Sequence, residues 1–279
     1  MIDAGTLRRF LKHPSGMFGT ALLVLVVLVA LFAGIYAPQG PWPIIGRPLQ
    51  WPGQIPAALL GTDHLGRDLL VDVVYGTRAS LFVGVAVAVF SIVLGTVIGA
   101  MAGYYGRWVD DALMRFTDAV QTVPSFLAAM VIVGVIGQSL VTVICAISIV
   151  SWPMVARLVR ADFLRLKSQD FILACRIMGM GDMQIIFTQI LPNCLSPIIV
   201  AASVIVASAI IVEAGLSFLG LGDPNVISWG SIIGGGRAAL RTAWHITLIP
   251  AVAVVITVLS LNLIGDALND VLNPHLKHR

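Results

Sequence analysis

The sequence predicts an all-α, polytopic membrane protein with six transmembrane helices and a folded cytoplasmic loop between the fourth and the fifth. Of its 279 residues, 58% are apolar and only 11% are charged, and the mean hydropathy is +0.96. So few charged side chains cannot cover the surface of a soluble globule of this size. The composition therefore places the chain in a lipid bilayer.

Six stretches are apolar enough to cross the bilayer, which takes about 20 mostly apolar residues in a helix. They are residues 17–37, 79–103, 118–137, 139–158, 195–219 and 244–268. The third and fourth are separated least clearly, with only Gly137, Gln138 and Ser139 between their apolar parts. Pro124 should kink the third, because proline removes a helical hydrogen bond.

These stretches divide the chain into five parts. The parts are an N-terminal arm (1–16), the first transmembrane helix (17–37), an external loop (38–76), a five-helix core (77–268) that includes the loop at 165–192, and a C-terminal tail (269–279).

The basic residues set the orientation, because cytoplasmic loops of membrane proteins carry an excess of Lys and Arg. With a cytoplasmic N-terminus, 12 of the 17 basic residues lie on the cytoplasmic side. The five outside are Arg47, Arg67, Arg78, Arg237 and Arg241. Both termini are therefore predicted to be cytoplasmic. The net charge of +3 follows from this topology and is no sign of nucleic-acid binding.

The loop at 165–192 is a polar island between two apolar stretches, with the sequence RLKSQDFILACRIMGMGDMQIIFTQILP. Its helix formers, the glycines at 179 and 181, and a stop at Pro192 predict two short helices around a turn. A folded loop at the cytoplasmic face of the membrane is a surface that a soluble partner can bind.

The external loop contains LLGTDHLGRDLL at 59–70, in which Asp63 and His64 suggest a metal or catalytic site. The spacing argues against it, because neighbouring side chains point in different directions and no second His or Cys stands nearby. Thr62 or Asp63 is expected to cap a following helix. Contact with an external partner remains the alternative. Trp229 and Trp244, in a later external loop, are typical of anchors at the membrane interface.

Small residues recur along the second stretch, where Gly95 and Gly99 form a GxxxG pattern flanked by Gly84 and Gly103. Glycine at this spacing lets the backbones of membrane helices approach closely. We therefore expect this helix to pack tightly against a neighbour.

The fifth stretch carries the only glutamate of the chain, Glu213. A carboxylate at membrane depth costs at least about 2.5 kcal/mol unless it faces a partner, a cavity or the interface. Glu213 and the nearby Ser217 are therefore candidates for a substrate pathway. Because Glu213 lies within a few turns of Gly222 at the external end, simple contact with water or a helix terminus is the alternative.

The loop at 165–192 resembles the cytoplasmic EAA loop of permease subunits in bacterial type I ABC importers. The pattern of that loop is EAA, three residues, Gly, nine residues and I-x-L-P. Leu173, Cys175 and Gln189 depart from it, while the spacing through Gly179 to Pro192 is intact. The resemblance implies an ATPase-coupling role for Asp170, Leu173, Ala174, Cys175, Gly179, Asp182, Leu191 and Pro192.

Three further stretches narrow the resemblance to the C-type permease subunit of dipeptide, oligopeptide and nickel importers. They are LLGTDHLGRDLLVDVVYGTRASL, AGYYGRWVDDALMRFTDAVQTVPSF and EAGLSFLGLGDPNVISWGSII. The resemblance implies half of a peptide translocation pathway in a bacterial inner membrane. The implied partners are a second, homologous permease subunit in a heterodimer, one or two cytoplasmic ATPase subunits, an external (periplasmic) solute-binding protein and membrane lipid. It implies no cofactor and no nucleic acid.

Several alternatives follow from the same residues. The same architecture could import nickel or another small solute. A secondary transporter would carry ion-coupling charges at mid-membrane and an internal repeat, whereas this chain offers one carboxylate and no evident repeat. An intramembrane enzyme would need a nucleophile and base, or paired metal ligands, within the helices. The sequence contains no GxxxxGK[ST] phosphate-binding loop, so ATP hydrolysis is expected in partner subunits.

Overall fold

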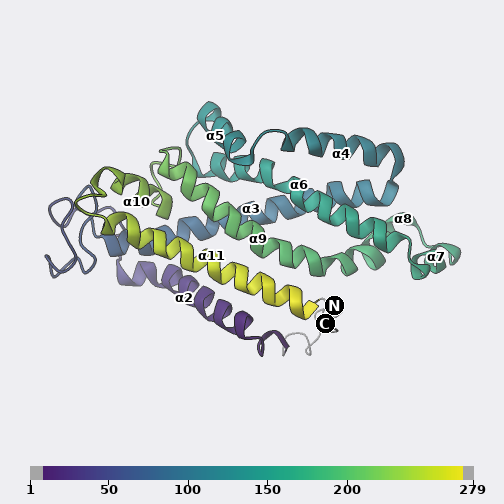
Figure 1. Cartoon of the computed structure of the whole chain (residues 1–279), viewed down its shortest axis with the longest axis horizontal. Coiled ribbons are helices and arrows are strands. Elements are labelled where there is room, and N and C mark those ends of the chain that lie inside the picture. The colour runs from purple at the N-terminus through teal and green to yellow at the C-terminus, as the bar shows by residue number, and fades with distance from the viewer. Residues whose placement is uncertain (1–8, 273–279) are drawn as a thin grey trace.

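The computed structural model describes residues 9–272, and in this part of the chain every regular element is helical (Figure 1). Residues 1–8 of the predicted arm and 273–279 of the predicted tail lie outside the described residues. Five helices are long and apolar enough to cross a membrane, and one bent pair makes up to six. The prediction of an all-α, polytopic membrane protein is confirmed.

The five long helices are α2 (Pro14–Tyr36), α3 (Leu69–Tyr105), α6 (Leu140–Lys167), α9 (Leu191–Phe218) and α11 (His245–Leu272). The bent pair is α4 (Arg107–Gln121) and α5 (Ser125–Ile136), and the shorter helices are α7 (Asp170–Ile177), α8 (Asp182–Ile185) and α10 (Trp229–Gly236). A π-helical turn, Ile186–Ile190, joins α8 to α9, and a 3-10 turn, Arg237–Ala239, follows α10.

Polar residues extend two helices beyond the apolar stretches. Helix α3 begins at Leu69, so the external loop ends before residue 76, and its N-cap is Asp68 in place of Thr62 or Asp63. The Asp68 carboxylate accepts a hydrogen bond from the backbone N–H of Leu70 at 2.9 Å, which satisfies a free donor of the first turn. Helix α6 likewise continues past residue 158 to Lys167.

The third predicted transmembrane stretch, 118–137, is not one helix. Helices α4 and α5 meet at an angle of 77°, because Pro124 cannot continue the helical hydrogen-bond ladder and disfavours a helical residue before it. The polar face of α4 is bound to α6 instead. Both carboxylate oxygens of Asp110 accept from Arg160, at 2.5 and 2.6 Å, and Asp118 accepts from Arg157 at 2.6 Å.

The expected close packing of the second stretch is confirmed, and its neighbour is α6. A Cβ on Gly95 would lie 2.5 Å from the Cβ of Val155, and one on Gly99 would lie 2.4 Å from the carbonyl oxygen of Ala156. Gly103 continues the row against Phe163. These three glycines therefore form a seam along which the two backbones touch.

The first and last helices pack side by side at the edge of the bundle. Gly19 of α2 faces Leu263 of α11, where a Cβ would lie 2.9 Å from the leucine Cβ. Figure 1 places the beginning of α2 and the end of α11 on the same side of the molecule as α7, opposite α10.

A second apolar core gathers at the end that carries α10. Trp229 is only 1% exposed and packs in a cluster with Leu69 and Ile246. Its indole N–H donates to the carbonyl of Val73 at 3.0 Å. The prediction that Trp229 is an interfacial anchor is therefore wrong, whereas Trp244 is half-exposed.

Candidate functional site

The 165–192 loop lies at one extreme of the long axis of the molecule, where α7 projects beyond the other helices (Figure 1). Helix α7 begins at Asp170 and ends at Ile177, and the chain then turns at a left-handed glycine, Gly179, with φ +80°. The N–H of Met180 donates to the carbonyl of Cys175, and the N–H of Gly179 donates to that of Arg176. This pair of bonds is the Schellman C-cap, which requires a positive φ that glycine adopts without strain.

One face of α7 is buried in the main core and the other is open. Ile172 and Cys175 pack in the same cluster as Phe163 and Leu166 at the end of α6. Cys175, to which the resemblance assigns an ATPase-coupling role with Ala174 and Gly179, is therefore buried and does not itself contribute to the exposed surface of the loop. It lies three residues after Ile172, and this spacing puts both on the inner face of a helix.

The open face of the loop is apolar at its tip. Leu173 is 49% exposed, Ile177 87% and Met178 72%, and Ala174, Asp170 and Asp182 are also exposed. Large apolar side chains in contact with one another at a surface typically mark an interaction site.

The second half of the loop differs from the predicted second short helix. Helix α8 continues through the π-helical turn into α9, so the whole of Asp182–Phe218 is one helical span. Pro192, the second residue of α9, does not stop this helix. It directly follows the π-helical turn Ile186–Ile190, where the N–H of Leu191 bonds to the carbonyl of Ile186 and the regular hydrogen-bond ladder is already interrupted. Leu191 and Pro192 are half-buried, and Ile185 and Ile190 are fully buried.

A residue from a distant part of the chain holds this loop. Tyr104, the last but one residue of α3, is 3% exposed, and its hydroxyl donates to the Asp182 carboxylate at 2.5 Å. The Lys167 ammonium donates to the carbonyl of Tyr104, and the Arg176 guanidinium lies 5.7 Å from the centre of the Tyr104 ring. Sequence reasoning missed Tyr104 because a tyrosine at the end of an apolar stretch is ordinarily an interface residue.

Glu213 and Ser217 lie at the opposite end, buried among this chain's own helices. The Ser217 hydroxyl donates to one Glu213 oxygen at 2.7 Å, and Ser80 of α3 donates to the other at 3.3 Å. The backbone N–H of Trp229 in turn donates to Ser80 at 3.4 Å. This network joins α3, α9 and α10, and it supplies the partners that a buried carboxylate needs.

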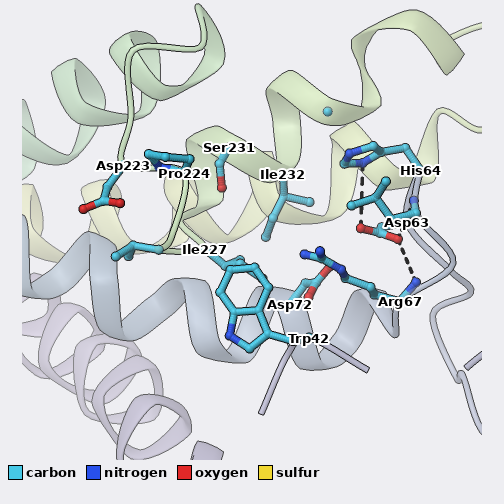
Figure 2. A pocket seen from close by; sticks show the side chains of 13 residues that line it. Trp42, Asp63, His64, Arg67, Asp72, Asp223, Pro224, Ile227, Ser231 and Ile232 are labelled. Carbon is cyan, nitrogen blue, oxygen red and sulfur yellow. Dashed lines mark hydrogen bonds and ion pairs between the residues drawn. The ribbon is translucent and has the colours of Figure 1, made fainter. Parts of the chain in front are cut away.

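The 59–70 segment lines a cavity of about 250 Å³ that faces α10 (Figure 2). One oxygen of Asp63 accepts from the backbone N–H groups of Leu65 and Arg67 at 2.8 and 2.7 Å. The other lies 3.7 Å from Nδ1 of His64. These contacts are turn chemistry, as the sequence predicted. Within the described residues, no group of three or more His, Cys, Asp or Glu is placed to hold a metal ion.

Comparison with known families decides what this arrangement is. Residues 95–278 match the family described as binding-protein-dependent transport system inner membrane component. The chain belongs to this family. Residues 4–52 of the permease also match a family described as the N-terminal transmembrane domain of oligopeptide transport permease C. The resemblance to permease subunits of ABC importers is thereby confirmed.

Curated relatives cover almost the whole permease. It is 43% identical to a putative peptide transport system permease protein of Brucella abortus, over 98% of this chain and 92% of the relative. It is 36% identical to the di/tripeptide transport system permease protein DppC of Pseudomonas aeruginosa, over 96% and 91%. The oligopeptide transport system permease protein OppC of Bacillus subtilis is 35% identical, over 96% and 88%.

The fold also matches a solved structure. A chain of the MetNI methionine ABC transporter in an inward-facing conformation superposes with a TM-score of 0.58 at 21% identity, over 70% of this chain and 93% of that chain. At this identity the likeness concerns the fold alone, which is that of an ABC importer permease.

Proposed function

We propose that this permease is one of two homologous subunits that form the translocation pathway of an ATP-driven peptide importer, and that the 165–192 loop couples it to cytoplasmic ATPases. The observation that carries the proposal is the construction of the loop. Its inner face, with Ile172 and Cys175, is buried in the core, while its tip exposes Leu173, Ile177 and Met178. A firmly anchored apolar tip can both bind a partner and transmit the partner's movement.

The remaining parts of the proposal concern the partners and the substrate. Peptide as the substrate rests on the relatives, whose names specify peptides, dipeptides or oligopeptides. A second permease subunit would complete the pathway, an external solute-binding protein would deliver the peptide, and the ATPase subunits would hydrolyse ATP, for which this chain has no phosphate-binding loop. The charge distribution favours cytoplasmic termini in a bacterial inner membrane.

The proposal also gives Glu213 and Ser217 a structural role. Because their hydrogen bonds fix α9 against Ser80 of α3, we propose that they shape the external half of the pathway wall from behind. Changing Glu213→Gln keeps the side-chain shape and alters the hydrogen bonds. An unchanged KM and maximal rate of dialanine uptake in that variant would contradict this role.

The coupling role is tested at Gly179, whose positive φ excludes most side chains. Gly179→Val forces a β-branched residue into the left-handed region, at a cost of about 1–2 kcal/mol. We expect the assembled complex to insert normally, to retain less ATPase on purification and to take up less radiolabelled dialanine. Gly179→Asn should do less harm, since Asn tolerates this conformation.

Gly181→Val is the matched control. Gly181 has φ −71°, and a Cβ on either glycine would meet nothing within 4 Å, so Gly181→Val adds the same side chain without backbone strain. Normal ATPase retention and normal uptake in Gly179→Val would remove the proposal. If Gly179→Val and Gly179→Asn both lose ATPase retention and dialanine uptake while Gly181→Val does not, the docked partner lies directly over Gly179.

A further inference from the structure

The 165–192 loop is continuous in sequence with α9 and with α6, which the glycine seam joins to α3. Helices α7 and α8 of the loop meet α3 at the side chain of Tyr104. We propose that the Tyr104 hydroxyl is the contact through which this loop moves α3, and hence that Tyr104 is a positioning residue for transport. The inference rests on the coupling role proposed above. It names a residue outside the loop that takes part in coupling. It also says that movement is transmitted from the ATPase side to the external end of α3.

Tyr104 contacts three successive parts of the loop region. Its hydroxyl binds Asp182, the first residue of α8, at 2.5 Å. Arg176, near the end of α7, lies over its ring, and so does Lys167, the last residue of α6, whose ammonium is 5.3 Å from the ring centre. Cations over an aromatic face are attracted by its quadrupole. A displacement of α7 or α8 therefore acts directly on this one side chain.

The backbone of α3 is held at the same point. Lys167 donates to the carbonyl of Tyr104, which is one of the last carbonyls of α3 and has no partner within its own helix. A positive charge is favourable there because the helix dipole places partial negative charge at its C-terminus. Tyr104 is thus bound through both its side chain and its main chain.

Helix α3 can carry a movement across the bilayer. It has 37 residues, includes no proline, and at about 1.5 Å per residue is on the order of 55 Å long. The glycine seam holds it against α6. At its far end Leu69 is fully buried beside α10 and α11. A rigid helix gripped at Tyr104 therefore connects the loop to the external core.

The turns that follow α3 and α7, next to the contact between Tyr104 and Asp182, leave room for movement. Gly106 follows α3 with φ +65°, and Gly179 follows α7 with φ +80°, and a Cβ on either would meet nothing within 4 Å. Neither glycine is packed against another group, so these two turns do not oppose a small displacement of α3 or α7 in which the contact between Tyr104 and Asp182 is kept.

Tyr104→Phe removes the hydroxyl and keeps the ring, and the next residue provides the matched control. Tyr105 is 42% exposed, and its hydroxyl makes no hydrogen bond in the part of the chain that the structure describes. Tyr105→Phe thus deletes the same atom without deleting a contact. Both variants are made in the full transporter, purified with its partner subunits and placed in lipid nanodiscs.

The readout is a thiol at the external end, so that no transport substrate is needed. Phe82→Cys puts it in an external cavity that Tyr75 and Arg78 also line, and Cys145→Ala removes the exposed natural thiol. The rate of modification by a charged maleimide is compared without nucleotide and with ATP and vanadate. The reference protein carries Phe82→Cys and Cys145→Ala alone. We expect the nucleotide to change the modification rate in the reference protein and after addition of Tyr105→Phe. With Tyr104→Phe we expect no such change, although ATPase content and ATP hydrolysis are retained.

The outcomes separate this inference from the function on which it rests. No nucleotide effect in the reference protein would contradict the coupling role and the inference with it. A full effect in Tyr104→Phe, an equal loss in Tyr105→Phe, or loss of the ATPase subunits from Tyr104→Phe would overturn the inference alone. In an Asp182→Ala background, where the acceptor is gone, Tyr104→Phe should change nothing further.

Discussion

In the proposed topology, α3 starts at its external end among buried hydrogen bonds and stops at its cytoplasmic end among charged side chains. The N–H of Leu69 donates to the carbonyl of Gly61 at 3.1 Å, next to a fully buried Thr62. At the other end Tyr104 meets Asp182, Arg176 and Lys167, of which the first two are exposed.

The difference bears on which end can move. A buried polar group that loses its partner costs its full desolvation, so the external contacts fix one geometry. Exposed charged groups exchange a partner for water at little cost, so Arg176 can shift around the ring of Tyr104, while the buried Tyr104 keeps its hydrogen bond to Asp182. The external end is therefore expected to follow α3 as a unit, while the cytoplasmic end adjusts.

The largest loss of stability is expected at the seam between α3 and α6, which lies between the two ends of α3. Gly99→Ala places a Cβ 2.4 Å from the backbone oxygen of Ala156, and a backbone atom cannot turn aside. We expect a loss of about 3 kcal/mol in the free energy of unfolding, at the upper end of overpacking costs. Thermal unfolding in detergent and the monodisperse yield measure it.

Gly134→Ala is the control for that substitution. Gly134 is inside α5 and a Cβ there would meet nothing within 4 Å, so alanine should be neutral or stabilise by about 0.5–1 kcal/mol. If both variants melt like the natural chain, the seam is not a rigid connection and the two ends of α3 are not joined as described.

The external end is tested at Thr62. Its hydroxyl donates to the carbonyl of Arg47 at 2.6 Å and accepts from the N–H of Gln50 at 2.9 Å. Thr62→Val keeps the shape and leaves both backbone groups without this partner, which should cost about 1–3 kcal/mol. We expect lower thermal stability and faster proteolytic cleavage of the 38–68 loop.

Thr242→Val serves as the comparison, because the Thr242 hydroxyl is exposed and bonds only within its own turn, to Ala239 at 3.2 Å. Equal resistance of the two variants to protease would show that the external loop is no more firmly held than an ordinary surface turn.

The sequence predicts the helices better than their ends. Long apolar stretches mark the helices because the bilayer demands them, and the GxxxG spacing correctly marks the face of α3 that meets α6. In the third stretch the kink at Pro124 is confirmed, but the hydropathy count does not show that it separates two helices at 77°. The cap of α3 was predicted at Thr62 or Asp63 and lies at Asp68, because several residues of this segment are equally good caps and only the tertiary contacts select one of them.

The candidate site also has features that the sequence predicts and one that it does not. The glycine turn at Gly179 follows from local chemistry and is visible in the sequence. The burial of Cys175 also has a local signal, in its spacing from Ile172. The contact of Tyr104 with Asp182 joins residues 78 positions apart, and no local pattern encodes it. Tertiary packing alone brings these two side chains together.

The smallest effect is expected at the cytoplasmic end, at the ion pair of Arg160 and Asp110. The Arg160 side chain is 35% exposed and that of Asp110 is 13% exposed, so water screens part of the attraction. Arg160→Met keeps the apolar stem and should cost about 1 kcal/mol. Arg165→Met, at a more exposed pair with an N–O distance of 3.2 Å, should cost less than about 0.5 kcal/mol.

The salt dependence of stability should differ between the two ends of the molecule. Because counter-ions screen exposed charges, the stability difference between the natural chain and Arg160→Met should shrink at high salt. The difference for Thr62→Val should stay constant, because that contact is buried and neutral. Thermal unfolding of both variants at low and high salt makes the comparison. A salt-independent deficit in Arg160→Met would mean that the ion pair between α4 and α6 is held as firmly as the buried contacts of the external loop.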